Sequence, residues 1–136
     1  MAEIRGGCHC GNISVTAELT RATTEYRPRA CDCDFCRKHG AAYLSDPAGS
    51  LRIAIRDARA TAAYRQGSGT AEFLVCTTCG VLVAVLYRDD RIYAALNANA
   101  VVAELAPTQP VSPKQLATDD KVARWRAVWF ADVVVG

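Results

Sequence analysis

The chain has 136 residues, of which 51% are hydrophobic and 22% are charged, and its formal net charge is only +2. This size and balance predict a single globular domain over residues 1–136. The small charge disfavours nucleic-acid binding, apolar stretches such as 81–87 are too short to cross a bilayer, and the N-terminus has no apolar signal region. We therefore expect a soluble cytoplasmic protein without nucleic-acid or membrane partners.

In chain order, the sequence predicts a mainly β protein with little helix. Alternating apolar and polar residues predict strands at 13–17 and 51–56, and further strands are expected at 71–75, 81–87 and 91–96. Turn-forming residues at 46–49 and 66–69 indicate loops, and the prolines of 106–113 indicate a short stiff connector.

A short helix is predicted near the C-terminal end of the chain. Ser112 and Pro113 suit the N-cap and the first position of a helix that starts there. Val122, Trp125 and Trp129 follow at i, i+3 and i+7, which gives the helix an apolar face. We expect this face to pack on a sheet.

Cysteine content is the outlying feature of the composition. Seven cysteines in a cytoplasmic chain argue against a disulfide framework, because that compartment keeps thiols reduced, and the odd number argues the same way. Metal binding or thiol chemistry is the expected use. The cysteines lie in three clusters, Cys8-His9-Cys10-Gly11, Cys31-Asp32-Cys33-Asp34-Phe35-Cys36 and Cys76-Thr77-Thr78-Cys79-Gly80.

The first and third clusters can supply one complete structural zinc site. Structural zinc takes four ligands in a tetrahedron and favours thiolates. A Cys-x-x-Cys turn at the tip of a hairpin presents two sulfurs on one side, and the glycine after it lets the backbone turn tightly. The predicted ligands are Cys8, Cys10, Cys76 and Cys79.

The middle cluster would then form an open site. Cys31, Cys33 and Cys36 lie within six residues, so one loop can present all three. Three protein ligands and a vacant fourth position are typical of a catalytic zinc.

The residues alone leave other partitions open. Cys31 or Cys33 could join the third cluster and leave the first cluster free, or the middle cysteines could be ordinary reduced thiols. An iron–sulfur cluster is a further alternative, although the common ferredoxin spacings are absent.

At these cysteines the sequence resembles the glutathione-dependent formaldehyde-activating enzyme family, which includes the centromere protein V group. The resemblance runs from about residue 4 to residue 100 and is carried by 6–11, 31–38 and 73–80. It implies an Mss4-like fold, with β-sheets gathered around a structural zinc. It also implies that the first and third clusters bind this zinc, and that Cys31, Cys33 and Cys36 bind a second, catalytic zinc.

The same resemblance implies an activity. The family's founding reaction, of the carbon–sulfur lyase type, joins glutathione to formaldehyde, so the implied partners are a small thiol and an aldehyde. A zinc-bound thiol is deprotonated, which suits this chemistry. The alternative is a non-catalytic zinc-bound binding or scaffold module of the same fold, although chromatin binding would need a basic tail or patch that this chain lacks.

Charged and polar residues near the clusters are weaker candidates. Arg37 and Lys38 could balance the negative charge of the thiolates, and His39 could act as an acid, a base or a fourth ligand, although such a histidine more often packs or faces solvent. His9 is expected to point away from the metal. Four arginines could bind the glutathione carboxylates, although such residues more commonly form a solvated face: Arg52, Arg56, Arg59 and Arg65. Tyr43 and Asp46 are further candidates, because they lie close to the triplet in sequence.

Overall fold

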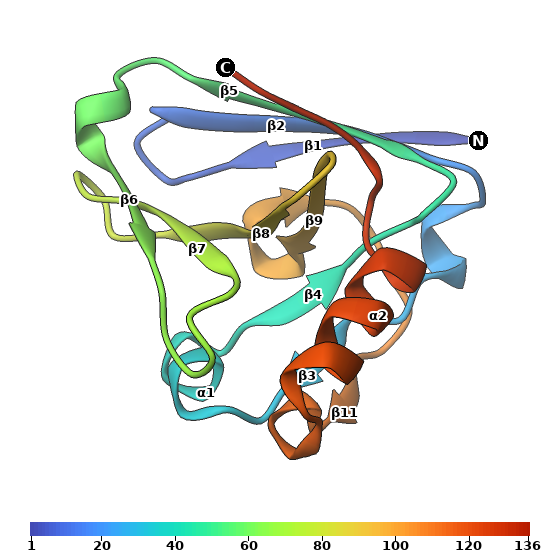
Figure 1. The fold of residues 1–136 in the computed structure, drawn as a ribbon. Coiled ribbons are helices and arrows are strands. Elements are labelled where there is room, and N and C mark those ends of the chain that lie inside the picture. The colour runs from blue at the N-terminus through green and yellow to red at the C-terminus, as the bar shows by residue number, and fades with distance from the viewer.

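A computed structural model describes residues 1–136 and shows two β-sheets with two short α-helices (Figure 1). Sheet A has the strand order β10-β1-β2-β5-β12, and sheet B has the order β11-β3-β4-β9-β8-β7-β6. The strands of sheet A are β1 (Ala2–Gly7), β2 (Ile13–Leu19), β5 (Ser50–Ile55), β10 (Val101–Val102) and β12 (Asp132–Val135). The strands of sheet B are β3 (Arg29–Cys31), β4 (Ala42–Leu44), β6 (Thr61–Tyr64), β7 (Glu72–Cys76), β8 (Leu82–Arg88), β9 (Ile92–Asn97) and β11 (Gln109–Val111).

Most neighbouring strands pair antiparallel, but two pairs are parallel. β11 runs parallel to β3 and places Val111 opposite Cys31, and β12 runs parallel to β5. Each of these late strands lies at the edge of its sheet, so the C-terminal part of the chain closes one edge of both sheets.

Sheet B is buried on both faces, which explains the continuous apolar run of β8. One face packs against sheet A in a cluster that includes Leu74, Ala84 and Leu96. The opposite face carries Phe73 and Val85, which alternate with those residues along the strands and belong to a second apolar cluster. The helices α1 (Asp34–His39) and α2 (Thr118–Val128) lie on this second side, away from sheet A (Figure 1).

The mainly β prediction is confirmed, and all five predicted strands are present as β2, β5, β7, β8 and β9. Of the strands without a prediction, all but β1 have at most four residues, too few to show a clear alternation. One of them, β11, lies inside the stretch predicted as a stiff connector. No helix has the length and apolar character that crossing a membrane requires.

The predicted helix exists, but its predicted start was wrong. Pro113 opens only a 3-10 turn, Pro113–Gln115, and Ser112 makes no capping hydrogen bond. Leu116 is extended, so the chain leaves the turn before α2 begins at Thr118. The expected packing is confirmed: Trp129 is buried and Trp125 half-buried against the second apolar cluster of sheet B.

A second helix within the middle cluster was not predicted. The Cys36 backbone N–H donates to the Cys33 sulfur at 3.5 Å, which caps the N-terminus of α1. The helix ends at Gly40, which takes the left-handed conformation with φ +62°. The middle cysteines are therefore presented by a strand end and a helix turn instead of a loop.

Candidate metal centres and the adjoining cavity

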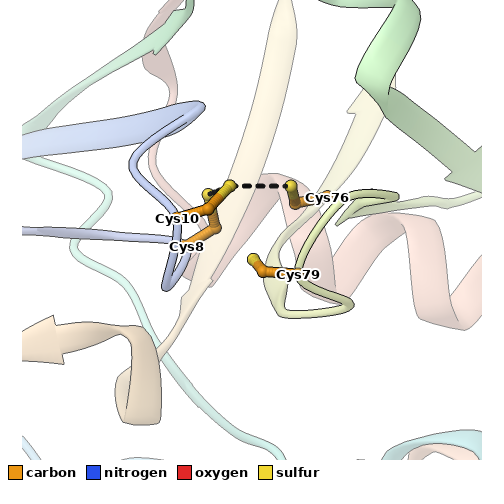
Figure 2. Close-up of side chains that lie close together, drawn as sticks. All are labelled: Cys8, Cys10, Cys76 and Cys79. Atoms are coloured by element: carbon orange, nitrogen blue, oxygen red, sulfur yellow. Dashed lines mark hydrogen bonds between the residues drawn. The ribbon is translucent and has the colours of Figure 1, made fainter.

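The first and third cysteine clusters meet at one point in the structure. Cys8 and Cys10 lie in the turn between β1 and β2, whereas Cys76 ends β7 and Cys79 lies in the turn between β7 and β8 (Figure 2). The four sulfurs all lie within 4.8 Å of one another, and no disulfide joins them. The cluster therefore links a hairpin of sheet A to a hairpin of sheet B.

Tight turns bring backbone amides to these sulfurs. Gly11 and Gly80 follow the two pairs with φ +86° and +79°, a region that favours glycine. The Ile13 N–H donates to the Cys8 sulfur at 3.2 Å. The N–H of Cys10 lowers the pKa of Cys79 to about 6, because a hydrogen bond to sulfur favours the thiolate.

The spacing of the sulfurs fits tetrahedral zinc. With zinc–sulfur bonds of about 2.3 Å, the sulfurs of a tetrahedral site are about 3.8 Å apart. The Cys8 and Cys10 sulfurs are 3.8 Å apart, and those of Cys10 and Cys76 are 3.6 Å apart. A disulfide would need a sulfur–sulfur distance of about 2.05 Å. Four thiols at this spacing have the donor chemistry of a closed structural zinc site.

The middle cluster forms a second group on the other side of sheet B. Cys31 ends β3, Cys33 caps α1 and Cys36 lies in its first turn, and the three sulfurs lie within 4.8 Å of one another. The Tyr43 hydroxyl lies 3.1 Å from the Cys36 sulfur, and the Gln66 amide donates to the Cys33 sulfur at 3.8 Å. Three thiols without a fourth protein ligand fit an open zinc site.

Two of these thiols, Cys31 and Cys36, differ in acidity. A hydrogen bond from Cys36 lowers the pKa of Cys31 to about 6. That shared proton, together with burial, raises the pKa of Cys36. Burial also raises the pKa of Tyr43, so its hydroxyl keeps its proton. Cys31 therefore becomes a thiolate before Cys36.

A cavity of about 160 Å³ opens beside the middle cluster. Its walls come from β3, α1 and β4, from the loop between β6 and β7, from β7 and β8, and from the C-terminal segment that runs from β11 through α2 to Trp129. The residues that line it fall into thiols, cations, apolar side chains and loop residues: Cys31, Cys33 and Cys36; Arg29, Lys114, Lys121 and Arg124; Tyr43, Ala71, Phe73, Val85, Val111, Pro113, Trp125 and Trp129; Gln66, Gly67 and Ser68.

The cations of this cavity are largely unpaired. Arg29 donates to the Ser45 hydroxyl at 2.7 Å, and neither Arg29 nor Arg124 bonds to a carboxylate of the chain. Burial and the nearby charge of Arg124 lower the pKa of Arg29 to about 10. Lys114 pairs loosely with Asp32 at 3.9 Å. The cavity is therefore suited to an anionic group.

Comparison with known proteins agrees with this geometry. Residues 3–116 match the family described as glutathione-dependent formaldehyde-activating enzyme. This chain belongs to that family. A crystal structure of a Rhodobacter sphaeroides protein shares 30% sequence identity with a TM-score of 0.54, and the likeness covers 71% of this chain and 85% of the other. No curated protein matches the chain.

The match to the formaldehyde-activating family ends at residue 116, before α2 begins. The wall that α2 adds to the cavity, with Lys121, Arg124, Trp125 and Trp129, therefore lies outside the matched segment. All seven cysteines, in contrast, lie within the family match.

Several residues that the sequence suggested do not line the cavity. Arg37, Lys38 and His39 are exposed on the far side of α1, where His39 packs on Phe35 with 4.6 Å between ring centroids. Asp46 accepts hydrogen bonds from Thr20 and Tyr26 instead, at 2.7 and 2.6 Å.

The four arginines proposed for the thiol's carboxylates are also elsewhere. Arg52, Arg59 and Arg65 pair with Asp132, Asp57 and Glu72, and Arg56 is exposed. All four are exposed to solvent, as the commoner interpretation expected. His9 is exposed, and Tyr43 does line the cavity.

The cations that do line the cavity were not singled out from the sequence. Lys121, Arg124 and Trp125 follow one another at i, i+3 and i+4, so one helix face carries both charge and indole. That spacing was a usable signal. Arg29 had no such signal in the sequence, because only the pairing of β3 with β4 brings it to the cavity.

Proposed function

We propose that this protein is a zinc-dependent enzyme that joins glutathione or a similar small thiol to formaldehyde or a related aldehyde. The observation that carries the proposal is the convergence of three thiols and four cationic side chains on one cavity. In the reaction, a carbon–sulfur bond forms between the thiol and the carbonyl carbon. The carbonyl oxygen becomes a hydroxyl and receives the proton that the thiol loses.

Two cysteine clusters, one of four thiols and one of three, support this function. Cys8, Cys10, Cys76 and Cys79 would hold a structural zinc, and the middle triplet would hold a second one. When bound by the triplet, zinc supplies a Lewis acid at which a small thiol is held deprotonated. The chain's own residues supply binding, orientation and proton control around that position.

The cations would bind the carboxylates of the thiol. Glutathione carries two carboxylates, and Arg29 and Arg124 are two guanidiniums near one another without an acidic partner. A carboxylate between them would relieve their mutual repulsion and form charge-assisted hydrogen bonds. Holding the thiol in this way places its sulfur close to the triplet, and proximity is the main source of rate enhancement expected here.

Tyr43 would control charge at the triplet. Its hydroxyl is buried, keeps its proton and lies 3.1 Å from the Cys36 sulfur, so it can donate to the sulfur when Cys36 is a thiolate. Gln66 faces Cys33 in the same manner from the opposite wall. These donors would stabilise the negative charge that gathers on the three sulfurs.

The test is an NMR exchange assay on zinc-loaded protein, which measures adduct formation between formaldehyde and glutathione against the spontaneous background. Cysteamine, a thiol without a carboxylate, serves as the comparison. We expect acceleration with glutathione and loss of it in Cys36→Ser. Absence of acceleration with any small thiol would overturn the proposal and favour the non-catalytic binding module.

A further inference from the structure

The cavity has an apolar side that neither glutathione nor formaldehyde would use. Ala71, Phe73, Val85, Trp125 and Trp129 line it, and all but Trp125 are at most 7% exposed. Glutathione is a polar, charged peptide, and formaldehyde has no apolar group. Apolar walls of this kind bind ligands by removing apolar surface from water.

The apolar wall is rigid, so it cannot collapse onto a small reactant. The two indoles stack with 4.8 Å between centroids and 16° between planes, and Tyr87 packs on Trp125 at 5.5 Å. Trp129 is further fixed because the next residue, Phe130, exchanges two backbone hydrogen bonds with Ala94 of β9. A wall held from behind in this way is preorganised for a ligand.

We propose that the aldehyde of this enzyme carries an aromatic or bulky aliphatic group, which packs against Phe73, Trp125 and Trp129 while the thiol's carboxylates bind the cations. The proposal rests on the proposed function, because it assigns the second reactant of the same site. It makes Trp125 a specificity-determining residue, and it places that specificity in α2, outside the family match.

The test uses two unreactive thioethers that stand in for the adducts. S-methylglutathione resembles the formaldehyde adduct, and S-benzylglutathione resembles the adduct of an aromatic aldehyde. Trp125 and Trp129 are the only tryptophans of the chain and both line the cavity, so intrinsic fluorescence reports binding at the wall itself. We expect the benzyl compound to bind at least roughly tenfold more tightly.

Substitution of the wall makes the test specific. Trp125→Ala should remove most of the preference for S-benzylglutathione while leaving the affinity for S-methylglutathione within about twofold. Trp125→Phe should retain the preference for S-benzylglutathione. Equal affinities of the two thioethers for the native protein, or a benzyl preference that persists in Trp125→Ala, would overturn the proposal and leave the proposed function intact. Binding of neither thioether would overturn both. The comparison of the two thioethers on the native protein tests the proposal even where a variant fails to fold.

Discussion

The role of each cysteine cluster can be tested by replacing single cysteines with serine. Cys79→Ser should destabilise the protein strongly, because the four-cysteine cluster links the β1–β2 hairpin to the β7–β8 hairpin. A zinc site of this kind does not exist in the unfolded chain, so its binding free energy contributes to folding. Cys36→Ser should be milder, keep one zinc and abolish thiol-dependent activity.

Chain length between the ligands sets the expected difference. Cys10 and Cys76 are 66 positions apart, and a cross-link that closes such a loop contributes about 4 kcal/mol in the chain-entropy description. The middle triplet spans only residues 31–36, for which the same relation gives about 2 kcal/mol. At about 3–5 °C per kcal/mol for a domain of this size, loss of the first link lowers Tm by about 12–20 °C and loss of the second by about half as much.

The decisive control is Cys10→Ser. Cys10 is exposed, so its replacement removes no buried packing and should be nearly neutral unless its sulfur holds a metal. We expect it to lower Tm and zinc content as Cys79→Ser does. The assay is thermal melting with zinc stoichiometry on the three variants together. A neutral Cys10→Ser, or a Cys36→Ser that unfolds as badly as Cys79→Ser, would refute the assignment of the two sites.

Three further outcomes are expected elsewhere in the molecule. Burial would raise the pKa of Asp46, but hydrogen bonds from Thr20 and Tyr26 outweigh it and lower that pKa to about 2. The contribution of Asp46 to the free energy of unfolding is therefore complete above its unfolded pKa of about 3.9 and is lost as pH falls through about 2. Acid unfolding of Asp46→Asn should lack this part of the pH dependence of stability. Arg124→Ala should raise KM for glutathione roughly tenfold or more and leave KM for cysteamine unchanged, whereas the exposed Arg5→Ala should change neither; an equal rise for both thiols would exclude carboxylate binding. Arg126→Ala should speed amide hydrogen exchange in α2, because Arg126 ties this helix to Asp89, Asp90 and Tyr93; unchanged exchange would show that the indoles alone hold the helix.

The sequence predicted the parts of the fold that depend on local pattern. Alternation found the long strands, and thiol spacing grouped the cysteines in the way that the structure brings them together. Their ligand roles stay predictions. Short strands such as β3 and β10 have too few residues to show a period, so only pairing partners define them.

The cations of the cavity show where local reasoning stops. Proximity in sequence suggested Arg37 and Lys38, but α1 turns both away from the triplet, since its inward position is taken by Cys36. Two of the four cations that line the cavity, Lys121 and Arg124, come from a helix more than eighty residues later in the chain. Their helical spacing indicated a shared face, but only tertiary packing brings that face to the triplet.

In the chain, α2 lies between two edge strands, β11 and β12, which belong to different sheets and each run parallel to their neighbour. This placement has a consequence for engineering and divergence. β11 and β12 fasten the segment to sheet B and sheet A by backbone pairing, which does not depend on the side chains of the helix between them. The residues of α2 that face the cavity can therefore be replaced while the strands and the thiols stay in place. Transplanting residues 118–129, which include both indoles, into a relative with the same two edge strands should transfer the reactant preference of this protein without disturbing its metal chemistry.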